Sequence, residues 1–249
     1  EKWPILPGIR NVIDLHPGEP SCLPELVGKF RELARHYSAF AVLGADVLDG
    51  HYSIGESMQR LEVARAASGQ GCATAILGFS INDHTPAEVL AALAAVAARG
   101  RLFARDPVSW RRLQNRGIRN LALVADLAFL MRPASRSGAT AEIEAWLGSE
   151  HASGRRVVML NLSATPLTGA RPGADDRAGA LVTLACDLVS HRNASILWCP
   201  HDLRPTVAPG DSDCELAAEF SRRVARRLGG NFHQRIASPM GADEIKRVA

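Results

Sequence analysis

The sequence predicts an α/β protein made of two domains, each with a parallel sheet and covering helices. Short apolar runs without charged residues alternate with longer stretches in which apolar residues recur at helical spacing. Strands that carry no charges are typical of parallel sheets buried on both faces. The alternation breaks once, in a segment rich in Pro, Ser and Gly at 133–156, which we interpret as a linker. We therefore expect a first domain at 1–132 and a second at 157–249, where the pattern stops on a helix with no following strand.

In the first domain, the pattern predicts one helix before the first strand and a helix between later strands. The clearest helix start is Thr85-Pro86-Ala-Glu88, with Thr as the cap and Pro at the first helical position. Asp106 can cap another helix in the same way, because the N–H that Pro107 lacks is not needed there. The expected elements are a helix at 21–38, a strand at 40–43, a helix at 54–68, a strand at 73–80, a helix at 85–100, a strand at 101–104, a helix at 107–116 and a strand region at 120–130.

The second domain repeats this alternation after the linker, in which only a short helix at 141–147 is expected. The expected elements are a strand at 157–162, a helix at 178–190, a strand at 196–199, a helix at 213–228, a last segment at 231–237 and the start of a helix at 241–249. Both halves are therefore Rossmann-like in their order of elements. Neither contains G-x-G-x-x-G or a P-loop motif, so the best sequence evidence for binding a dinucleotide, or a nucleotide at a P-loop, is missing.

The overall composition excludes several kinds of protein. The chain carries 29 Lys and Arg against 26 Asp and Glu, a net charge of +3, and its basic clusters, such as 222–223 and 226–227, are short and scattered. We interpret these clusters as solvated positions and expect no nucleic-acid binding. Five cysteines without a C-x-x-C pair fit free thiols in a reducing compartment, which favours the cytoplasm. No apolar run is long enough to span a membrane, and no signal peptide is recognised, although the chain opens at Glu1.

Polar residues follow the ends of several predicted strands. Because the carboxyl ends of parallel strands share one edge of a sheet, the clusters of the first domain are expected to lie together. Arg105 is the most informative member, since a planar, permanently charged guanidinium beside a helix N-terminus suits a phosphate or carboxylate ligand. The four clusters are Asp46, Asp49 and His51; Asn82, Asp83 and His84; Arg105 and Asp106; and, in the second domain, His201 and Asp202.

Each cluster also has a purely structural interpretation. Arg105 could pair only with the aspartate that follows it, the other aspartates could serve turns or helix caps, and the histidines could begin a helix or lie at the surface. A zinc site built from His51, His84 and His201 is the least favoured hypothesis, because no two of them show the spacing of metal ligands.

In their order along the chain, these motifs resemble the polysaccharide pyruvyl transferase family. That family has two Rossmann-like domains in a GT-B-like arrangement, which the resemblance implies here for about residues 40 to 235. The matching features are the strand and acidic turn at 42–50, the strand at 76–82, Arg105-Asp106 with Ser109, Gly117, Asp126, the strand at 157–162, Pro200-His201 and the helix start at 211–213. Two family elements are not seen: a Gly-Asn-rich loop after a first strand, and an Arg-x-His element in the second domain. His233 precedes Arg235 rather than following it, so the catalytic role of that element is not assigned to His233.

The resemblance implies a transferase that moves a pyruvyl group from phosphoenolpyruvate onto two hydroxyls of a glycan, forming a pyruvate ketal. Arg105 would hold the anionic donor and stabilise charge on the leaving phosphate, and His201 would transfer protons. The implied substrate-binding set is Asp46, Asp49, Asn82, Arg105, Asp106, Ser109 and His201, with the first two orienting acceptor hydroxyls. No metal and no cofactor besides the donor substrate is implied. The expected partners are this small-molecule donor and a glycan or lipid-linked glycan acceptor, and a homo-oligomer is left open.

Two other functions are compatible with the motifs. A nucleotide-sugar glycosyltransferase or epimerase of GT-B type would share the fold and bind its donor mainly on the second domain. A non-catalytic glycan-binding relative would keep glycan affinity without transfer activity. Thermal protection by a uridine nucleotide, but not by phosphoenolpyruvate, would indicate the first alternative, and tight glycan binding without turnover would indicate the second.

Overall fold

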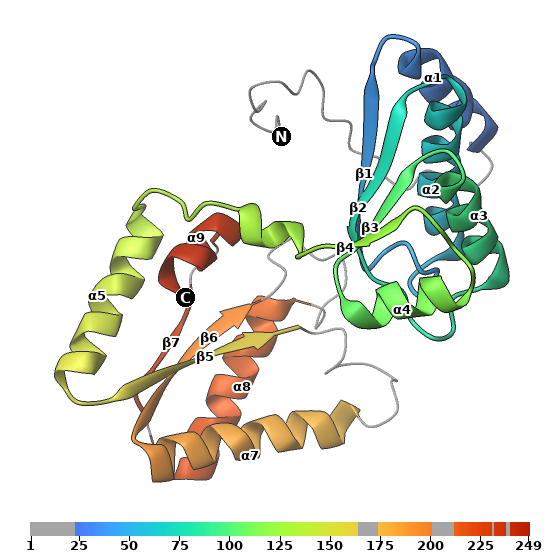
Figure 1. Ribbon diagram of the computed structural model, residues 1–249. Helices are drawn as coiled ribbons and strands as arrows, with labels where there is room; N and C mark the ends of the chain where they lie inside the picture. Colours follow the sequence, from blue (N-terminus) through green and yellow to red (C-terminus); the bar gives the residue numbers. More distant parts are fainter. Residues whose placement is uncertain (1–22, 164–173, 201–211, 231, 238–239) are drawn as a thin grey trace. The chain divides into compact units, whose positions relative to one another are not determined.

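Figure 1 shows the computed structural model of the chain as ribbons coloured along the sequence. The residues that the structure describes are 23–163, 174–200, 212–230, 232–237 and 240–249. Their contacts divide the chain into two units, Glu1–Leu130 and Met131–Ala249. Each unit contains a sheet with parallel strand pairs and packed helices, which confirms the predicted α/β class with parallel sheets. The GT-B-like arrangement concerns how two domains sit together, and it stays a prediction.

The first unit is built on a four-stranded sheet with the strand order β1-β2-β3-β4. A helix connects each strand to the next. The strands are β1 (Ala39–Ala45), β2 (Ala73–Phe79), β3 (Arg101–Ala104) and β4 (Leu121–Leu123), and the helices are α1 (Leu23–Ala34), α2 (Ile54–Gly69), α3 (Ala87–Ala97), α4 (Pro107–Asn115) and the 3-10 helix η2 (Leu127–Leu130).

Helices α2, α3 and α4 pack on one face of this sheet. Val42, Ile76 and Leu102, one from each of three neighbouring strands, join residues of these helices in a single buried core. Consecutive right-handed crossovers in this strand order place successive helices on the same face. Leu43, which points to the other face of β1, is 69% exposed. The three helices therefore leave that other face uncovered.

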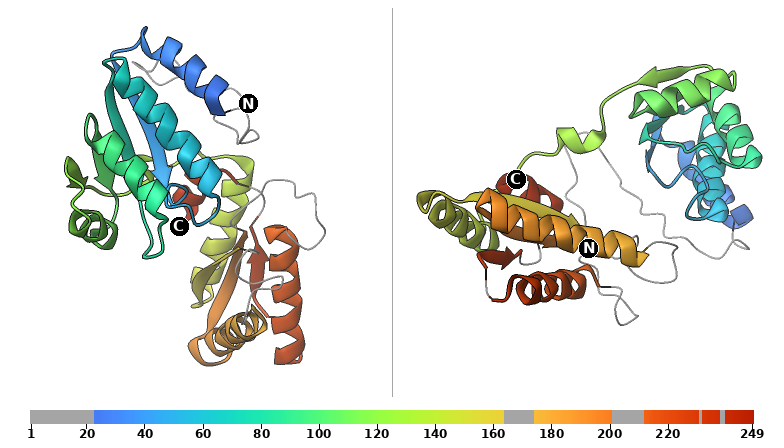
Figure 2. Two further views of the ribbon diagram at one scale, coloured as in Figure 1. Left: turned by 90° about the vertical axis from the view of Figure 1, so that its right-hand side faces the viewer. Right: turned by 90° about the horizontal axis from the view of Figure 1, so that it is seen from below.

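The second unit has three layers around a sheet of order β5-β6-β7. Helices α7 and α8 pack on one face around Trp198 and Phe220, and α5 and α9 pack on the other around Ile143 and Leu197. Figure 2 gives two further views of these layers. The elements are α5 (Gly138–Ala152), β5 (Arg156–Leu162), α7 (Ala174–Arg192), β6 (Ala194–Pro200), α8 (Asp213–Leu228), β7 (Gln234–Ile236) and α9 (Ala242–Val248). Throughout the described ranges, no helix combines the length and the apolar character needed to cross a membrane.

Helix α9 packs against α5 in the second unit. Arg247 Nε donates a hydrogen bond to Glu144 Oε1 at 2.7 Å, and Arg247 Nη1 donates to the Ala134 carbonyl at 3.3 Å. The Ala134 N–H in turn donates to the Asp243 carbonyl at 2.9 Å. These contacts join the segment before α5 to the most C-terminal helix of the chain.

The segment 133–156, predicted to be a linker, instead contains helix α5 of the second unit. The helix has 15 residues, whereas the sequence analysis expected a short helix at 141–147. Ser137 and Thr140 form a capping box at its start, and Ile143 is only 1% exposed because it packs against the sheet. The Pro- and Ser-rich residues before it mark the start of a packed helix.

The strand predicted at 120–130 was also wrong in its extent. The structure has only the three-residue strand β4, followed by a loop and η2. Asp126 Oδ1 accepts a hydrogen bond from the Ala128 N–H at 2.9 Å, which turns the chain into η2. Because the run 127–130 is apolar, its composition alone does not separate a strand from a 3-10 turn.

The cysteines in the described ranges are free thiols, as the sequence predicted. Burial raises the pKa of the Cys72, Cys199 and Cys214 thiols, so the reactive thiolate form is disfavoured at these positions. Cys22 lies outside the described residues.

Candidate active site at the carboxyl edge of the first sheet

The loops that follow the strands of the first unit are joined by hydrogen bonds at the carboxyl edge of its sheet. Asn82 Nδ2 donates to Asp49 Oδ2 at 2.7 Å, which links the loops after β1 and β2. Ser80 Oγ donates to Asp106 Oδ2 at 2.8 Å, which links the ends of β2 and β3. The structure therefore brings together the three clusters of the first unit. The fourth cluster, with His201, lies outside the described residues.

Arg105 is held at this edge by two neighbours from different loops. Its Nε donates to Ser80 Oγ at 2.8 Å, and its Nη1 donates to Asp126 Oδ2 at 2.8 Å. The structural alternative considered for the sequence was an ion pair with the adjacent Asp106, but the structure pairs Arg105 with Asp126, which follows β4. The Arg105 side chain remains 25% exposed, so a fixed arginine beside the start of α4 is partly accessible to solvent.

Asp106 is the N-cap of α4, as predicted. Its Oδ1 accepts the Ser109 N–H at 2.7 Å, and its Oδ2 accepts the Ser80 hydroxyl. Burial acts to raise the pKa of Asp106, but hydrogen bonds from Ser109, Ser80 and the Val108 backbone outweigh it and leave this pKa below its ordinary value. The ionised carboxylate thereby fixes Ser80, which in turn accepts the bond from Arg105. In these contacts Asp106 positions Arg105 indirectly.

Ser109 anchors the loop after β2 from the first turn of α4. Its hydroxyl accepts the Ile81 N–H at 2.9 Å and donates to the Ile81 carbonyl at 3.3 Å. The residue is 1% exposed, so it has almost no surface with which to touch a substrate. The predicted substrate contact of Ser109 does not fit this burial, and its observed contacts give it a positioning role.

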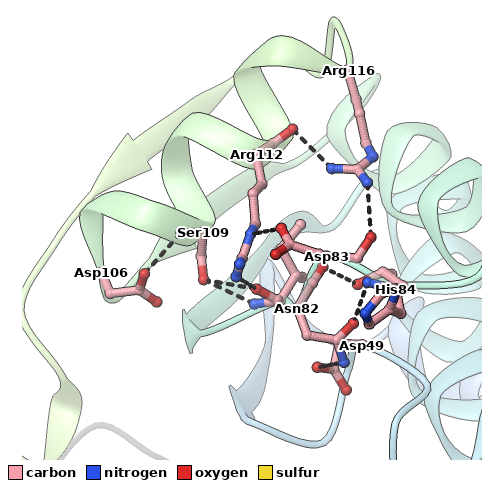
Figure 3. A network of polar contacts seen from close by, with 10 residues as sticks. Asp49, Asn82, Asp83, His84, Asp106, Ser109, Arg112 and Arg116 are labelled. Carbon is pink, nitrogen blue, oxygen red and sulfur yellow. Dashed lines mark hydrogen bonds and ion pairs between the residues drawn. The ribbon is translucent and has the colours of Figure 1, made fainter.

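Two arginines that were not singled out from the sequence hold the same loop, Arg112 of α4 and Arg116 at the C-cap of that helix (Figure 3). Arg112 Nη1 donates to the Ile81 carbonyl at 2.7 Å, and Arg112 Nε forms an ion pair with Asp83. Arg116 Nη2 donates to the Asp83 carbonyl at 3.3 Å. The hydrogen bond from Arg112 lowers the pKa of Asp83. The available sequence signal was the spacing of four residues between the two arginines, which puts both on one side of α4.

The aspartates after β1 differ in accessibility. Asp49 is 7% exposed, and its Oδ1 accepts the His51 N–H at 2.9 Å while its Oδ2 holds Asn82. These contacts are those of a residue that shapes its turn, which was the structural alternative. Asp46 is exposed, and its Oδ2 accepts the Tyr52 hydroxyl at 3.2 Å. Of the two carboxylates, Asp46 is the one that an acceptor could reach.

Asn82 organises the loop that presents His84. Its Oδ1 accepts the His84 N–H at 2.7 Å, and its carbonyl accepts the Thr85 hydroxyl at 2.9 Å. Thr85 therefore does not cap α3 as predicted; Pro86 takes the N-cap position, with no side-chain cap. His84 is exposed.

Across the described ranges, no three His, Cys, Asp or Glu side chains gather as metal ligands would.

Replacing Ser109 with alanine is expected to destabilise the first unit by about 1–3 kcal/mol, because the buried Ile81 N–H would lose its partner. Native-state amide hydrogen exchange should show faster exchange at Ile81, and urea unfolding should show the loss of stability. Ser149→Ala is the matched control, since the Ser149 hydroxyl is exposed and bonds only within its own helix at Trp146; its effect should stay within about 0.5 kcal/mol. Equal effects of the two substitutions would contradict the anchoring role.

The fold and this edge define an α/β protein whose first unit presents a fixed guanidinium at the carboxyl ends of parallel strands, where anionic ligands bind in open α/β sheets. The family model described as polysaccharide pyruvyl transferase matches residues 10–231. The chain therefore belongs to the polysaccharide pyruvyl transferase family, as its motifs indicated, and this is a family of transferases.

Comparison with solved structures adds a likeness to an enzyme. A UDP-forming alpha,alpha-trehalose-phosphate synthase from Burkholderia vietnamiensis is similar to this chain, with a TM-score of 0.49 and 13% sequence identity. The similarity covers 90% of this chain and 52% of the synthase, so this chain spans about half the length of that enzyme. A search of curated protein sequences gave no match.

Proposed function

We propose that this protein transfers a pyruvyl group from phosphoenolpyruvate to a pair of glycan hydroxyls and so forms a pyruvate ketal. Membership of the family supports the reaction class, and the placement of Arg105 is the observation that supports the site. Phosphoenolpyruvate carries a carboxylate and a phosphate, and both are ligands that a guanidinium binds through paired hydrogen bonds. The donor would bind at the carboxyl edge of the first sheet.

Arg105 would act as the anion clamp. Ser80 and Asp126 hold its guanidinium in place, so little reorganisation is needed when a ligand arrives. During transfer, negative charge grows on the departing phosphate, and a fixed cation stabilises that charge. Asp126 opposes donor binding by its own charge, so the donor must compete with an ion pair whose members are 25% and 34% exposed. The pair is partly buried rather than fully enclosed, and the bond from Arg105 Nε to Ser80 would keep the guanidinium in place while the donor replaces Asp126 as its partner.

Acceptor binding and proton transfer would involve further residues. The exposed carboxylate of Asp46 would accept hydrogen bonds from sugar hydroxyls, while Asp49 and Asn82 keep the two adjacent loops together. His201 is proposed as the proton-transfer group, because a histidine exchanges protons near neutral pH. The acceptor would be a glycan, free or lipid-linked, with the reaction in the cytoplasm, where phosphoenolpyruvate is available. The reaction as proposed uses no cofactor.

A thermal-shift titration tests this function. Phosphoenolpyruvate is expected to raise the melting temperature, because a ligand at about 100 times its Kd adds about 2.7 kcal/mol to the stability of the folded state. Uridine diphosphate, run in parallel, is expected to give no rise, and equal concentrations of inorganic phosphate control for general anion effects. Stabilisation by uridine diphosphate alone would point to a nucleotide-sugar enzyme. Absence of a response to either ligand would contradict the proposed donor.

A further inference from the structure

The C-terminal half of α8 presents a group of arginines at the surface of the second unit. Residues 219–228 contain four arginines and one glutamate, a formal sum of +3. Three of the arginines, Arg223, Arg226 and Arg227, line a shallow hollow of about 380 Å³ together with Val182 of α7. From the sequence, these arginines were expected at solvated positions. Their arrangement around one hollow calls for another interpretation.

Neutral groups hold two of these guanidiniums in place. Arg227 Nη1 donates to Thr183 Oγ1 at 2.9 Å, and the Thr183 hydroxyl donates in turn to the Gly179 carbonyl at 3.0 Å. The Arg223 guanidinium lies over the Phe220 ring, 5.4 Å from its centroid. These contacts fix the positions of the two cations without neutralising their charges. Both guanidiniums are thus preorganised for an anion.

The single carboxylate in this stretch compensates the cations only weakly. Glu219 Oε1 lies 3.5 Å from Arg226 Nη2, and Glu219 Oε2 lies 3.2 Å from Arg222 Nη2. The arginine side chains of these two pairs are each 66% exposed, and exposed ion pairs are worth little. One glutamate shared between two arginines leaves net positive charge at the hollow.

The hollow lies away from the carboxyl edge of the second sheet. Helix α8 runs from the end of β6 back to the start of β7, and β6 and β7 are parallel. The C-terminal half of α8 therefore lies toward the amino ends of these strands (Figure 1). In open α/β sheets, substrates bind at the opposite, carboxyl edge. A ligand at the arginines would leave that edge free.

We propose that this hollow, lined by Arg223, Arg226, Arg227 and Val182, is a second anion-binding site and that it takes a phosphate-bearing ligand. Guanidinium groups bind phosphate through two parallel hydrogen bonds, and several of them converge here within one surface depression. The same chemistry serves a soluble diphosphate or the headgroup of an anionic phospholipid. The residues of this site belong to the second unit, whereas Arg105 belongs to the first.

The test compares the double variant Arg226→Ala/Arg227→Ala with a control that removes the same charge elsewhere. Arg35→Ala/Arg65→Ala is that control, because both arginines are exposed and pair with glutamates of the first unit. Isothermal titration calorimetry with inorganic pyrophosphate probes a soluble ligand. Co-sedimentation with vesicles of phosphatidylcholine and phosphatidylglycerol in equal parts probes a lipid headgroup.

We expect the affinity of the α8 variant for at least one probe to fall about tenfold or more, while the control variant binds both probes with nearly the affinity of the original protein. Loss of pyrophosphate binding would identify a soluble phosphate ligand, and loss of vesicle binding alone would identify a headgroup. Equal weakening in both variants, or no binding of either probe by the original protein, would overturn the proposal. The phosphoenolpyruvate-induced rise in melting temperature should persist in the α8 variant, which separates this site from the proposed donor site.

Discussion

Replacing Arg105 with alanine is expected to remove the stabilisation by phosphoenolpyruvate and to lower pyruvyl transfer by about 10²–10³-fold. The substitution deletes the cation that Ser80 and Asp126 hold at the carboxyl edge of the first sheet. Loss of this cation should destabilise the transition state, in which negative charge builds up on the departing phosphate, more than the ground state. We therefore expect kcat to fall as well as donor affinity. Thermal-shift titration and release of inorganic phosphate in the presence of an acceptor glycan would measure the two effects.

Two further variants separate this clamp from a merely structural role. Arg105→Lys keeps the charge but loses the planar fork, so its activity should fall between those of the original protein and Arg105→Ala. Asp126→Asn keeps the size of the side chain and removes a competing negative charge, so phosphoenolpyruvate affinity should be unchanged or higher. A response to phosphoenolpyruvate that survives Arg105→Ala intact would show that the donor binds elsewhere.

Trp198→Ala is expected to destabilise the second unit by about 3–5 kcal/mol. The Trp198 side chain is fully buried on the central strand β6, and its ring packs 6.5 Å, centroid to centroid, from that of Phe220. Its Nε1 also donates to Gln234 Oε1 at 2.8 Å, so alanine would leave a cavity and remove the partner of a partly buried amide. Urea unfolding followed by amide hydrogen exchange in β6 would locate the loss in this unit.

The control for this substitution is Trp146→Ala. Trp146 lies on α5 and is only partly buried, so its removal should destabilise the same unit by clearly less. If the two tryptophan variants lost the same stability, the apolar core around Trp198 would not be the main source of stability in the second unit.

The elements that the sequence predicted best are those with strong local signals at both ends. Helix α8 was predicted within its observed bounds, because Ser212 caps its start and Gly229 adopts a positive φ of 72° at its end. Helix α5 was mistaken for part of a linker, since the Pro- and Ser-rich residues before it carry a loop signal. The burial of Ile143 depends on a sheet that forms from later residues, so the local sequence does not reveal it.

The location of the candidate site was predictable from the sequence, but the contacts that its arginines make were not. Parallel strands place their carboxyl ends at one edge, and this rule alone brought Asp49, Asn82 and Arg105 to the same region. The partner of Arg105 depends on where β4 ends relative to β3, and the sequence pattern extended that strand too far. The loop contacts of Arg112 were missed because they join residues far apart in the chain. The catalytic role of His201 stays a prediction.

The contact between α9 and α5 has a consequence for how the second unit folds. The hydrogen bond from Arg247 to Ala134 spans 113 positions of the chain, so forming it closes a very long loop. The entropy lost in closing a loop grows with its length, and contacts of this kind tend to form after local ones. On a ribosome, the part of the apolar side of α5 that packs against α9 would therefore stay uncovered until α9 is synthesised. Until then, this nascent unit would expose a surface that chaperones recognise.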